Sequence, residues 1–174
     1  MSVHVEEIDH GWERIQKELK KLNGSYTAVG FFGSGGTPEN DLAARAAVNE
    51  LGATIKVTKK MRFYFLYKFG VMLKKAILKI PKRPFMKLTF EKNKGKINDQ
   101  LDKEYDNIII GKYTSKQALS RIGEWWTGLT KLTIRTATFK RNAPLTIKQK
   151  GSTRPLVDGG EMFNGVDHRE KMKS

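Results

Sequence analysis

The segment from Thr114 to Leu132 carries the repeat that most constrains the fold of this chain. Apolar residues recur there at alternating spacings of four and three, at Ala118, Ile122, Trp125, Leu129 and Leu132. This spacing places the five side chains on one face of an α-helix, and such a face has to be covered by another element. Thr114 and Gln117 occupy the two positions of a capping box, so we expect the helix to begin beside them.

Three other segments are predicted to be helical. One runs from Ile8 to Leu22 and ends at Asn23-Gly24, and another runs from Leu88 to Ile110 and ends at Gly111. Both show apolar residues at helical spacing, followed by a residue type that commonly terminates helices. Thr37 as a possible cap, followed by Pro38 and Glu39, predicts the start of another helix, which continues through the alanine-rich segment 41–51 and ends at Gly52.

Strand formers dominate three short segments between these helices. They are SYTAVGFF at 25–32, ATIKVT at 53–58 and AILKI at 76–80, the last ended by Pro81. The segment MRFYFLYKFGVML at 61–73 is either a short buried helix or a pair of aromatic strands, because its periodicity fits both. The sequence therefore predicts an α+β fold, a small and mainly antiparallel sheet packed against two or three amphipathic helices.

The stretch NAPLTIKQKGSTRPLVDGG, residues 142–160, has the glycine and proline content of a loop. A loop of this length is unusual inside a compact domain, and it also carries four apolar residues, Leu145, Ile147, Leu156 and Val157. We expect one α+β core domain at 1–140 and an extended assembly arm at 141–174 that becomes ordered against a partner.

The net charge of the 174 residues is +15, and the excess is concentrated in one segment. Between Ala53 and Phe90 there are eleven basic residues and no acidic one. Such a block is either a solvated surface or the contact site for a polyanion, namely nucleic acid or an acidic protein. The residues expected to face a DNA channel or an acidic partner are Lys59, Lys60, Arg62, Lys74 and Lys75.

The chain contains no cysteine, which excludes disulfides and thiolate metal sites and is compatible with a reducing cytoplasm. Its first residues do not resemble a signal peptide, and no apolar run has the length of a membrane helix. We therefore expect a soluble protein that contacts no membrane.

No catalytic pattern is visible. His4, His10 and His168 lie in charged or terminal segments, and the GSGG turn at 33–36 fits neither a Walker loop nor GxGxxG. A group of acidic residues could suggest a metal-dependent nuclease, but a solvated helix surface with scattered carboxylates is the favoured interpretation; the group is Asp99, Asp102, Glu104 and Asp106. We expect a non-enzymatic protein without a metal or cofactor.

Three separated stretches form a more specific pattern. The first is AAVNELG at 46–52, with Asn49, Glu50, Leu51 and Gly52. The second is IPKRPFM at 80–86, with Ile80, Pro81, Arg83, Pro84 and Phe85. The third lies within 142–160 and has the most matching positions, which are Asn142, Ala143, Pro144, Thr146, Ile147, Lys150, Gly151, Pro155, Leu156, Asp158 and Gly160.

In this order and at these distances, the three stretches resemble the tail-completion, or virion-morphogenesis, proteins of tailed bacteriophages, over roughly residues 25–165. The resemblance implies a structural subunit of the neck or tail, made in the host cytoplasm and built into the virion. It also implies a homo-oligomeric ring, hexameric in form, around the DNA path. Expected neighbours are the head–tail connector, the tail terminator or tail tube proteins, and packaged DNA in the channel.

Two positions depart from the family pattern. Gly159 stands where the family usually has threonine, so a hydroxyl that could fix the turn is missing. The family pattern continues into an apolar strand, whereas the sequence after Glu161 is mostly polar. We expect this last segment to order only against a neighbouring subunit.

Pro81 and Pro84 fix their own φ angles and favour extended conformations at the residues before them. The chain is therefore expected to leave a strand in a rigid turn that directs Phe85 inward. Arg83 in this turn has two possible roles. It either ties the turn to a nearby carboxylate or carbonyl, or it forms an ion pair with another subunit.

Overall fold

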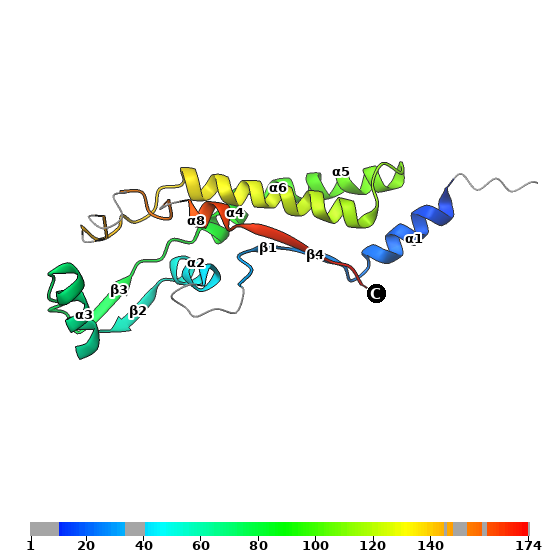
Figure 1. The fold of residues 1–174 in the computed structure, drawn as a ribbon. Coiled ribbons are helices and arrows are strands. Elements are labelled where there is room, and N and C mark those ends of the chain that lie inside the picture. Colours follow the sequence, from blue (N-terminus) through cyan, green and yellow to red (C-terminus); the bar gives the residue numbers. More distant parts are fainter. Residues whose placement is uncertain (1–10, 34–40, 145, 148–152, 158–159, 174) are drawn as a thin grey trace, which may run out of the picture. The chain divides into compact units, whose positions relative to one another are not determined.

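The computed structural model describes residues 11–33, 41–144, 146–147, 153–157 and 160–173 (Figure 1). It is an α+β structure, which confirms the predicted fold class. Along the chain the elements are α1 (Trp12–Leu22), β1 (Tyr26–Gly30), α2 (Leu42–Leu51), β2 (Ala53–Lys56), α3 (Lys59–Phe69), β3 (Ile77–Ile80), α4 (Phe85–Asn93), the 3₁₀ turn η1 (Lys94–Lys96), α5 (Ile97–Ile109), α6 (Ser115–Thr136), α8 (Glu161–Asn164) and β4 (Asp167–Lys171).

The chain forms two compact units, and each consists of more than one chain segment. Unit 1 comprises residues 1–30, 90–129 and 166–174, and unit 2 comprises residues 31–89 and 130–165. Where one sheet was expected, the described residues form two antiparallel ladders of two strands, β1 with β4 and β2 with β3. Each unit contains one of these ladders.

In unit 1 the β1–β4 ladder joins segments from opposite ends of the chain. The two strands lie side by side (Figure 1), and Tyr26 pairs with Lys171 and Gly30 with Asp167. Unit 1 also contains α1, residues 90–93 of α4, η1, α5 and residues 115–129 of α6. Its buried apolar residues are Ile108, Ala118, Leu119 and Val166.

Strand β4 lies within the predicted assembly arm, and it pairs with its own chain in the structure. The expectation that the polar end orders only against a neighbour is therefore wrong for Asp167–Lys171. The inward positions His168 and Glu170 are polar, but their side chains are 3.3 Å apart, and His168 Nε2 is 3.3 Å from the Ser120 hydroxyl on α6. Polar groups that satisfy one another can form the inner face of a strand without apolar residues.

Gly123 lets α6 approach this ladder closely. A Cβ atom at this position would lie 2.5 Å from His168 Cδ2 and 2.7 Å from Thr27 Oγ1, closer than normal van der Waals contact. Gly128 lies on the same helix and is exposed, and a Cβ atom there would meet no neighbouring atom within 4 Å. The two glycines therefore form a matched pair for substitution.

We expect Gly123→Ala to lower the free energy of unfolding by about 1 to 3 kcal/mol, because the methyl group overpacks the contact between α6 and β4. Gly128→Ala should raise it by up to about 1 kcal/mol, because alanine is the better helix former at an open position. Denaturant unfolding of both variants checks the pair. Equal effects of the same sign would contradict the close approach at Gly123.

Unit 2 contains the β2–β3 ladder (Figure 1), in which Ala53 pairs with Ile80 and Lys56 with Ile77. Its buried apolar residues come from several elements and are Ala46, Phe85, Ile134, Leu156 and Met162. Phe85 is 1% exposed and meets the Phe31 ring edge to face at a centroid distance of 5.8 Å. The expectation that the proline turn directs Phe85 inward is confirmed.

One predicted helix is divided in the structure. The helix expected from Leu88 to Ile110 is interrupted, because η1 separates α4 from α5 at Lys94-Gly95-Lys96. Glycine is unfavourable in a helix interior and explains the break.

The segment at 61–73, whose periodicity allowed a helix or two strands, contributes most of α3, and none of the side chains of this helix is buried. Thr58 caps its start by accepting a hydrogen bond from the Met61 amide at 3.2 Å.

Candidate assembly site

The three stretches of the sequence pattern meet at Arg83 in unit 2. The Arg83 Nη1 atom donates to Asn49 Oδ1 at 2.8 Å, and Nη2 donates to Asn142 Oδ1 at 2.8 Å. Its Nε atom donates to the Lys140 carbonyl at 3.1 Å. Each asparagine comes from a different stretch, so one guanidinium joins segments that are 34 and 59 residues away in sequence. We call these three side chains the Arg83 junction.

The Arg83 side chain is buried, with 6% of the residue exposed. Burial lowers the pKa of the guanidinium from its usual value, although arginine stays protonated at ordinary pH. All three acceptors are neutral oxygens, so the charge is stabilised by hydrogen bonds from the junction. The structure thus supports the interpretation that Arg83 ties the turn to a carbonyl, and its guanidinium already has internal partners at all three nitrogens.

Helix α2 fixes the first side of the junction. The Asn49 side chain donates to the Arg45 carbonyl at 2.8 Å, and the Asn49 carbonyl accepts from the Arg83 amide at 2.7 Å. The next residue, Glu50, accepts hydrogen bonds from the amides of Met86 and Lys87 at 2.9 and 3.0 Å. Because these amides lie in the first turn of α4, Glu50 caps that helix and also compensates its dipole.

Gly52 joins α2 to β2 in a conformation that favours glycine, with φ of 72°. A Cβ atom here would lie 3.0 Å from the Ile80 carbonyl oxygen and 2.9 Å from the Lys82 side chain. The close approach brings the end of the first stretch beside the start of the second, at Ile80 and Pro81. Gly52, Ile80, Pro81, Pro84 and Phe85 therefore shape the turn that presents Arg83.

The third stretch is described only in part. Asn142 belongs to the junction, and Leu156 is buried with φ of 65°, a left-handed conformation that is rare for leucine. Leu156 lines a cavity of about 100 Å³ together with Arg83 and Asn142. Pro144 is exposed and Pro155 half-buried. Lys150, Gly151 and Asp158 lie outside the described residues.

The basic segment centres on α3. Lys59, Lys60, Lys74 and Lys75 are all exposed, so their ammonium groups are accessible to a partner. Arg62 differs, because its guanidinium donates to the carbonyls of Leu73 and Lys75 and holds the following loop against α3. Of the five residues predicted to contact DNA or an acidic partner, Arg62 therefore has an internal structural role.

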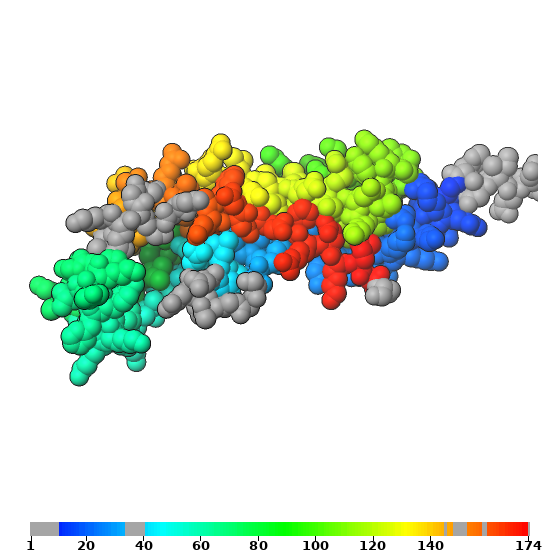
Figure 2. Space-filling view, viewed as in Figure 1, coloured from blue at the N-terminus to red at the C-terminus, as the bar shows by residue number. Residues whose placement is uncertain are grey.

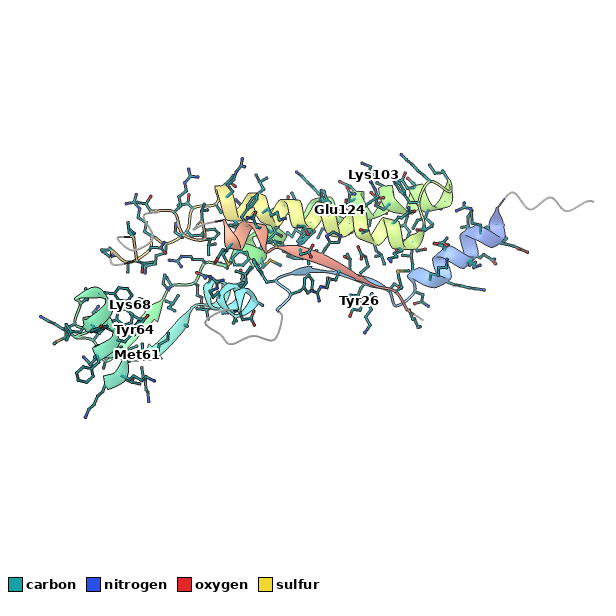
Figure 3. All side chains as sticks on the ribbon, in the orientation of Figure 1. Tyr26, Met61, Tyr64, Lys68, Lys103 and Glu124 are labelled. Carbon is teal, nitrogen blue, oxygen red and sulfur yellow. The ribbon has the colours of Figure 1, made fainter. Side chains whose placement is uncertain are left out.

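Aromatic side chains are exposed on the same helix. Phe63 is 72% exposed and Tyr67 is 96% exposed. Lys68 donates to the Tyr64 hydroxyl at 2.9 Å, and this hydrogen bond raises the pKa of Lys68 (Figure 3). Figure 2 shows α3, in blue-green, with its side chains on the molecular surface. Exposed apolar groups beside positive charges are typical of a surface that binds a partner.

Unit 1 contains a buried carboxylate that sequence reasoning did not identify. Glu18 of α1 accepts from the backbone amide and from the hydroxyl of Ser115, each at 2.7 Å, and from Lys21 at 2.6 Å. The hydrogen bond from Lys21, followed by that from the Ser115 amide, lowers the pKa of Glu18 from 4.5 to about 2. The sequence signal was weak, since a glutamate within a charged helix usually faces solvent.

The four acidic residues of α5 differ in their burial. Glu104 is buried and accepts hydrogen bonds from Arg121 at 3.2 Å and from Gln100 at 3.0 Å. Asp99, Asp102 and Asp106 are exposed. The prediction of scattered carboxylates on a solvated surface is wrong in two respects, because Glu104 faces the core and the three exposed aspartates lie on one side of the helix. Among the described residues, no group of three or more His, Cys, Asp or Glu is placed to hold a metal ion.

Trp125 and Trp126 line a cavity of about 350 Å³ in unit 1 with Val29, Phe90 and Leu101. Adjacent residues of a helix lie about 100° apart, which predicts one tryptophan in the core and the other against a flanking element or a partner subunit. Both rings are half-buried, and their centroids are 5.6 Å apart. The two side chains therefore belong to one apolar surface.

Within the described part of the chain, every helix is too short or too polar to span a lipid bilayer. The sequence was compared with protein-family models and curated proteins, and the structure with solved structures. None of the three comparisons finds a match.

Proposed function

We propose that the chain is a non-enzymatic structural protein of a tailed-phage virion, which completes the tail or joins it to the head as a ring subunit around the DNA path. The Arg83 junction carries this proposal. The sequence pattern that resembles tail-completion proteins consists of three separate stretches, and Asn49, Arg83 and Asn142 come from one stretch each. A shared structural element explains why these residues occur together at these distances.

Exposed apolar side chains add a second argument. Large side chains with at least half their surface exposed occur on α1, α3 and α4, and include Trp12, Phe63, Tyr67 and Phe90. Subunits of larger assemblies present such surfaces, since their apolar groups are covered by neighbours. The proposed interactions are with further copies of the chain, the head–tail connector and the tail terminator or tail tube proteins.

The genetic test is disruption of the coding gene in the phage that carries it. The proposal expects full heads and separate tails, and restoration of joined particles when the intact chain is supplied from a plasmid. Normal joined particles in the absence of the chain would contradict it.

A free nucleic-acid-binding protein is the second candidate function. The observation that favours it is the segment from Ala53 to Phe90, with eleven basic residues and no acidic one, together with exposed aromatic rings on α3. In this case binding to DNA should weaken steeply with salt, because each phosphate contact releases counterions. The intact virion should then lack the chain.

Neutralising the exposed lysines tests the role of the basic segment. We expect the variant Lys59→Gln, Lys60→Gln, Lys74→Gln, Lys75→Gln to unfold within about 1 kcal/mol of the unmodified chain, because exposed charges contribute little to stability. The same variant should fail to support particle assembly or genome retention. Plaque formation and denaturant unfolding measure the two effects, and a variant that loses its fold would contradict the assignment of these lysines to an exposed surface.

A further inference from the structure

Helix α3 has an outward face that combines positive charge with aromatic surface. Successive residues of a helix are about 100° apart, which places Lys59, Lys60, Phe63 and Tyr67 within about 100° of one another. All four are exposed. The less exposed residues Met61, Phe65 and Phe69 lie on the opposite side. We refer to these four exposed residues as the α3 face.

Helix α5 has an outward face of the opposite charge. Asp99, Asp102, Asp106 and Ile109 lie within about 80° on the same helical projection, and all four are exposed. Glu104 and Ile108 are on the other side and are buried. We refer to the four exposed residues as the α5 face. Lys103 is also exposed and lies at the edge of the α5 face (Figure 3).

The two faces are complementary in charge and in apolar content. The α3 face offers two ammonium groups and two rings, and the α5 face offers three carboxylates and an isoleucine, with Tyr105 beside them at 45% exposure. Within the described chain, the three carboxylates form no ion pair with a lysine or arginine. The α5 face is therefore an acidic surface on a chain whose net charge is +15.

We propose that the α3 face of one copy docks on the α5 face of the next copy. The contact joins two different surfaces, so it is heterologous, and heterologous contacts generate rings when the rotation closes. Each copy then uses its α3 face toward one neighbour and its α5 face toward the other. Lysine–aspartate pairs set the orientation of the contact, and the aromatic and aliphatic side chains supply its buried area. This inference rests on the proposed function, for which it supplies the contact surfaces.

Zero-length cross-linking identifies the contact directly. The full chain is prepared unlabelled and ¹⁵N-labelled, mixed in equal amounts and treated with a carbodiimide, which joins lysines to carboxylates in contact. We expect peptides that carry Lys59 or Lys60 of one isotope form joined to peptides that carry Asp99, Asp102 or Asp106 of the other. Cross-links restricted to single-isotope pairs would place the contact within one chain and overturn the proposal.

Charge reversal supplies the second test. Lys59→Glu with Lys60→Glu, or Asp99→Lys with Asp102→Lys, should each weaken self-association about tenfold or more, measured by sedimentation, because like charges then face each other. The chain that carries all four changes should recover association to within about threefold, because the complementarity is restored in reverse. Glu124→Lys on the exposed surface of α6 is the control and should leave association unchanged (Figure 3).

Other results overturn the inference. If reversal on α3 abolishes binding to duplex DNA while reversal on α5 changes nothing, the α3 face binds nucleic acid. If the four changes together do not restore association, the two faces do not contact each other. If virions contain the chain but these cross-links do not form, the proposed function stands and the contact between the α3 and α5 faces is rejected. If the cross-links form in the purified chain but virions lack the chain, the contact stands and the proposed function is rejected.

Discussion

Replacing Arg83 with methionine is expected to lower the free energy of unfolding by about 3 to 5 kcal/mol. The change removes three hydrogen bonds from a buried guanidinium and leaves the oxygens of Asn49, Asn142 and Lys140 without their donor. Hydrogen bonds from a charged donor contribute more than neutral ones, and the half-buried oxygens of Asn49 and Asn142 are only partly accessible to water that could replace the donor. Denaturant unfolding with linear extrapolation measures the loss.

Two other variants separate the effect of the hydrogen bonds of the Arg83 junction from the effect of its positive charge. Arg83→Lys keeps the positive charge but cannot reach three acceptors with one ammonium group, so we expect an intermediate loss. Arg45 is a nearby control, since its 2.6 Å ion pair with Glu161 joins side chains that are 43% and 60% exposed. Arg45→Met should cost less than about 1 kcal/mol. If Arg83→Met costs no more than Arg45→Met, the junction does not hold the three segments together.

Acid is expected to destabilise unit 1 through Glu18. Its pKa is about 2 in the folded chain and about 4.5 as an ordinary glutamate, so the unfolded state binds the proton more readily. The stabilisation is therefore present above pH 4.5 and is lost as the pH falls toward 2. A difference of this size corresponds to about 3 kcal/mol.

The variant Glu18→Gln isolates this contribution. We expect it to be less stable at pH 7 and to lose less stability than the unmodified chain as the pH falls from 5 to 2. Glu124→Gln on the exposed surface of α6 is the control and should keep the original pH dependence. Unfolding curves at several pH values check both variants. Parallel acid profiles for the Glu18→Gln and unmodified chains would show that the contacts of Glu18 with Lys21 and Ser115 do not stabilise the fold.

Local sequence patterns predicted most of the individual elements. The capping box was correct, because the Thr114 amide donates to Gln117 Oε1 at 2.9 Å and the Gln117 amide donates to Thr114 Oγ1 at 3.3 Å. These signals succeed because capping and amphipathic spacing involve residues a few positions apart. The helix break at Gly95 was missed, although the apolar pattern changes there: Leu88 and Ile97 are nine residues apart and would lie on opposite sides of one continuous helix.

Long-range pairings were much less predictable. Strand β4 has the sequence DHREK, and its pairing with β1 depends on His168 and Glu170 meeting each other and Ser120 of α6. Polar alternation of this kind also occurs in exposed segments, so periodicity alone cannot identify the strand. The partner of Glu18 is 97 residues away, and no local pattern indicates that Ser115 should meet it.

The residues of the candidate site could be predicted from the sequence, but their geometry could not. The sequence grouped Asn49, Arg83 and Asn142 through a resemblance, and the role of Arg83 was left open between a local tie and a contact with another subunit. The hydrogen bonds of the Arg83 junction favour the local tie. On α5, the buried Glu104 and the exposed aspartates could not be separated from composition, although the helical projection distinguishes them.

The proposed function requires the chain to be built into the virion as a ring. The most direct measurement is its copy number in purified, intact particles of the phage that encodes it, by quantitative mass spectrometry against the major capsid protein. We expect a small, fixed number that matches one ring and does not change after the particles are washed in high salt. The proposed function is wrong if the chain is absent from intact particles, or if its amount varies between preparations and is removed by salt.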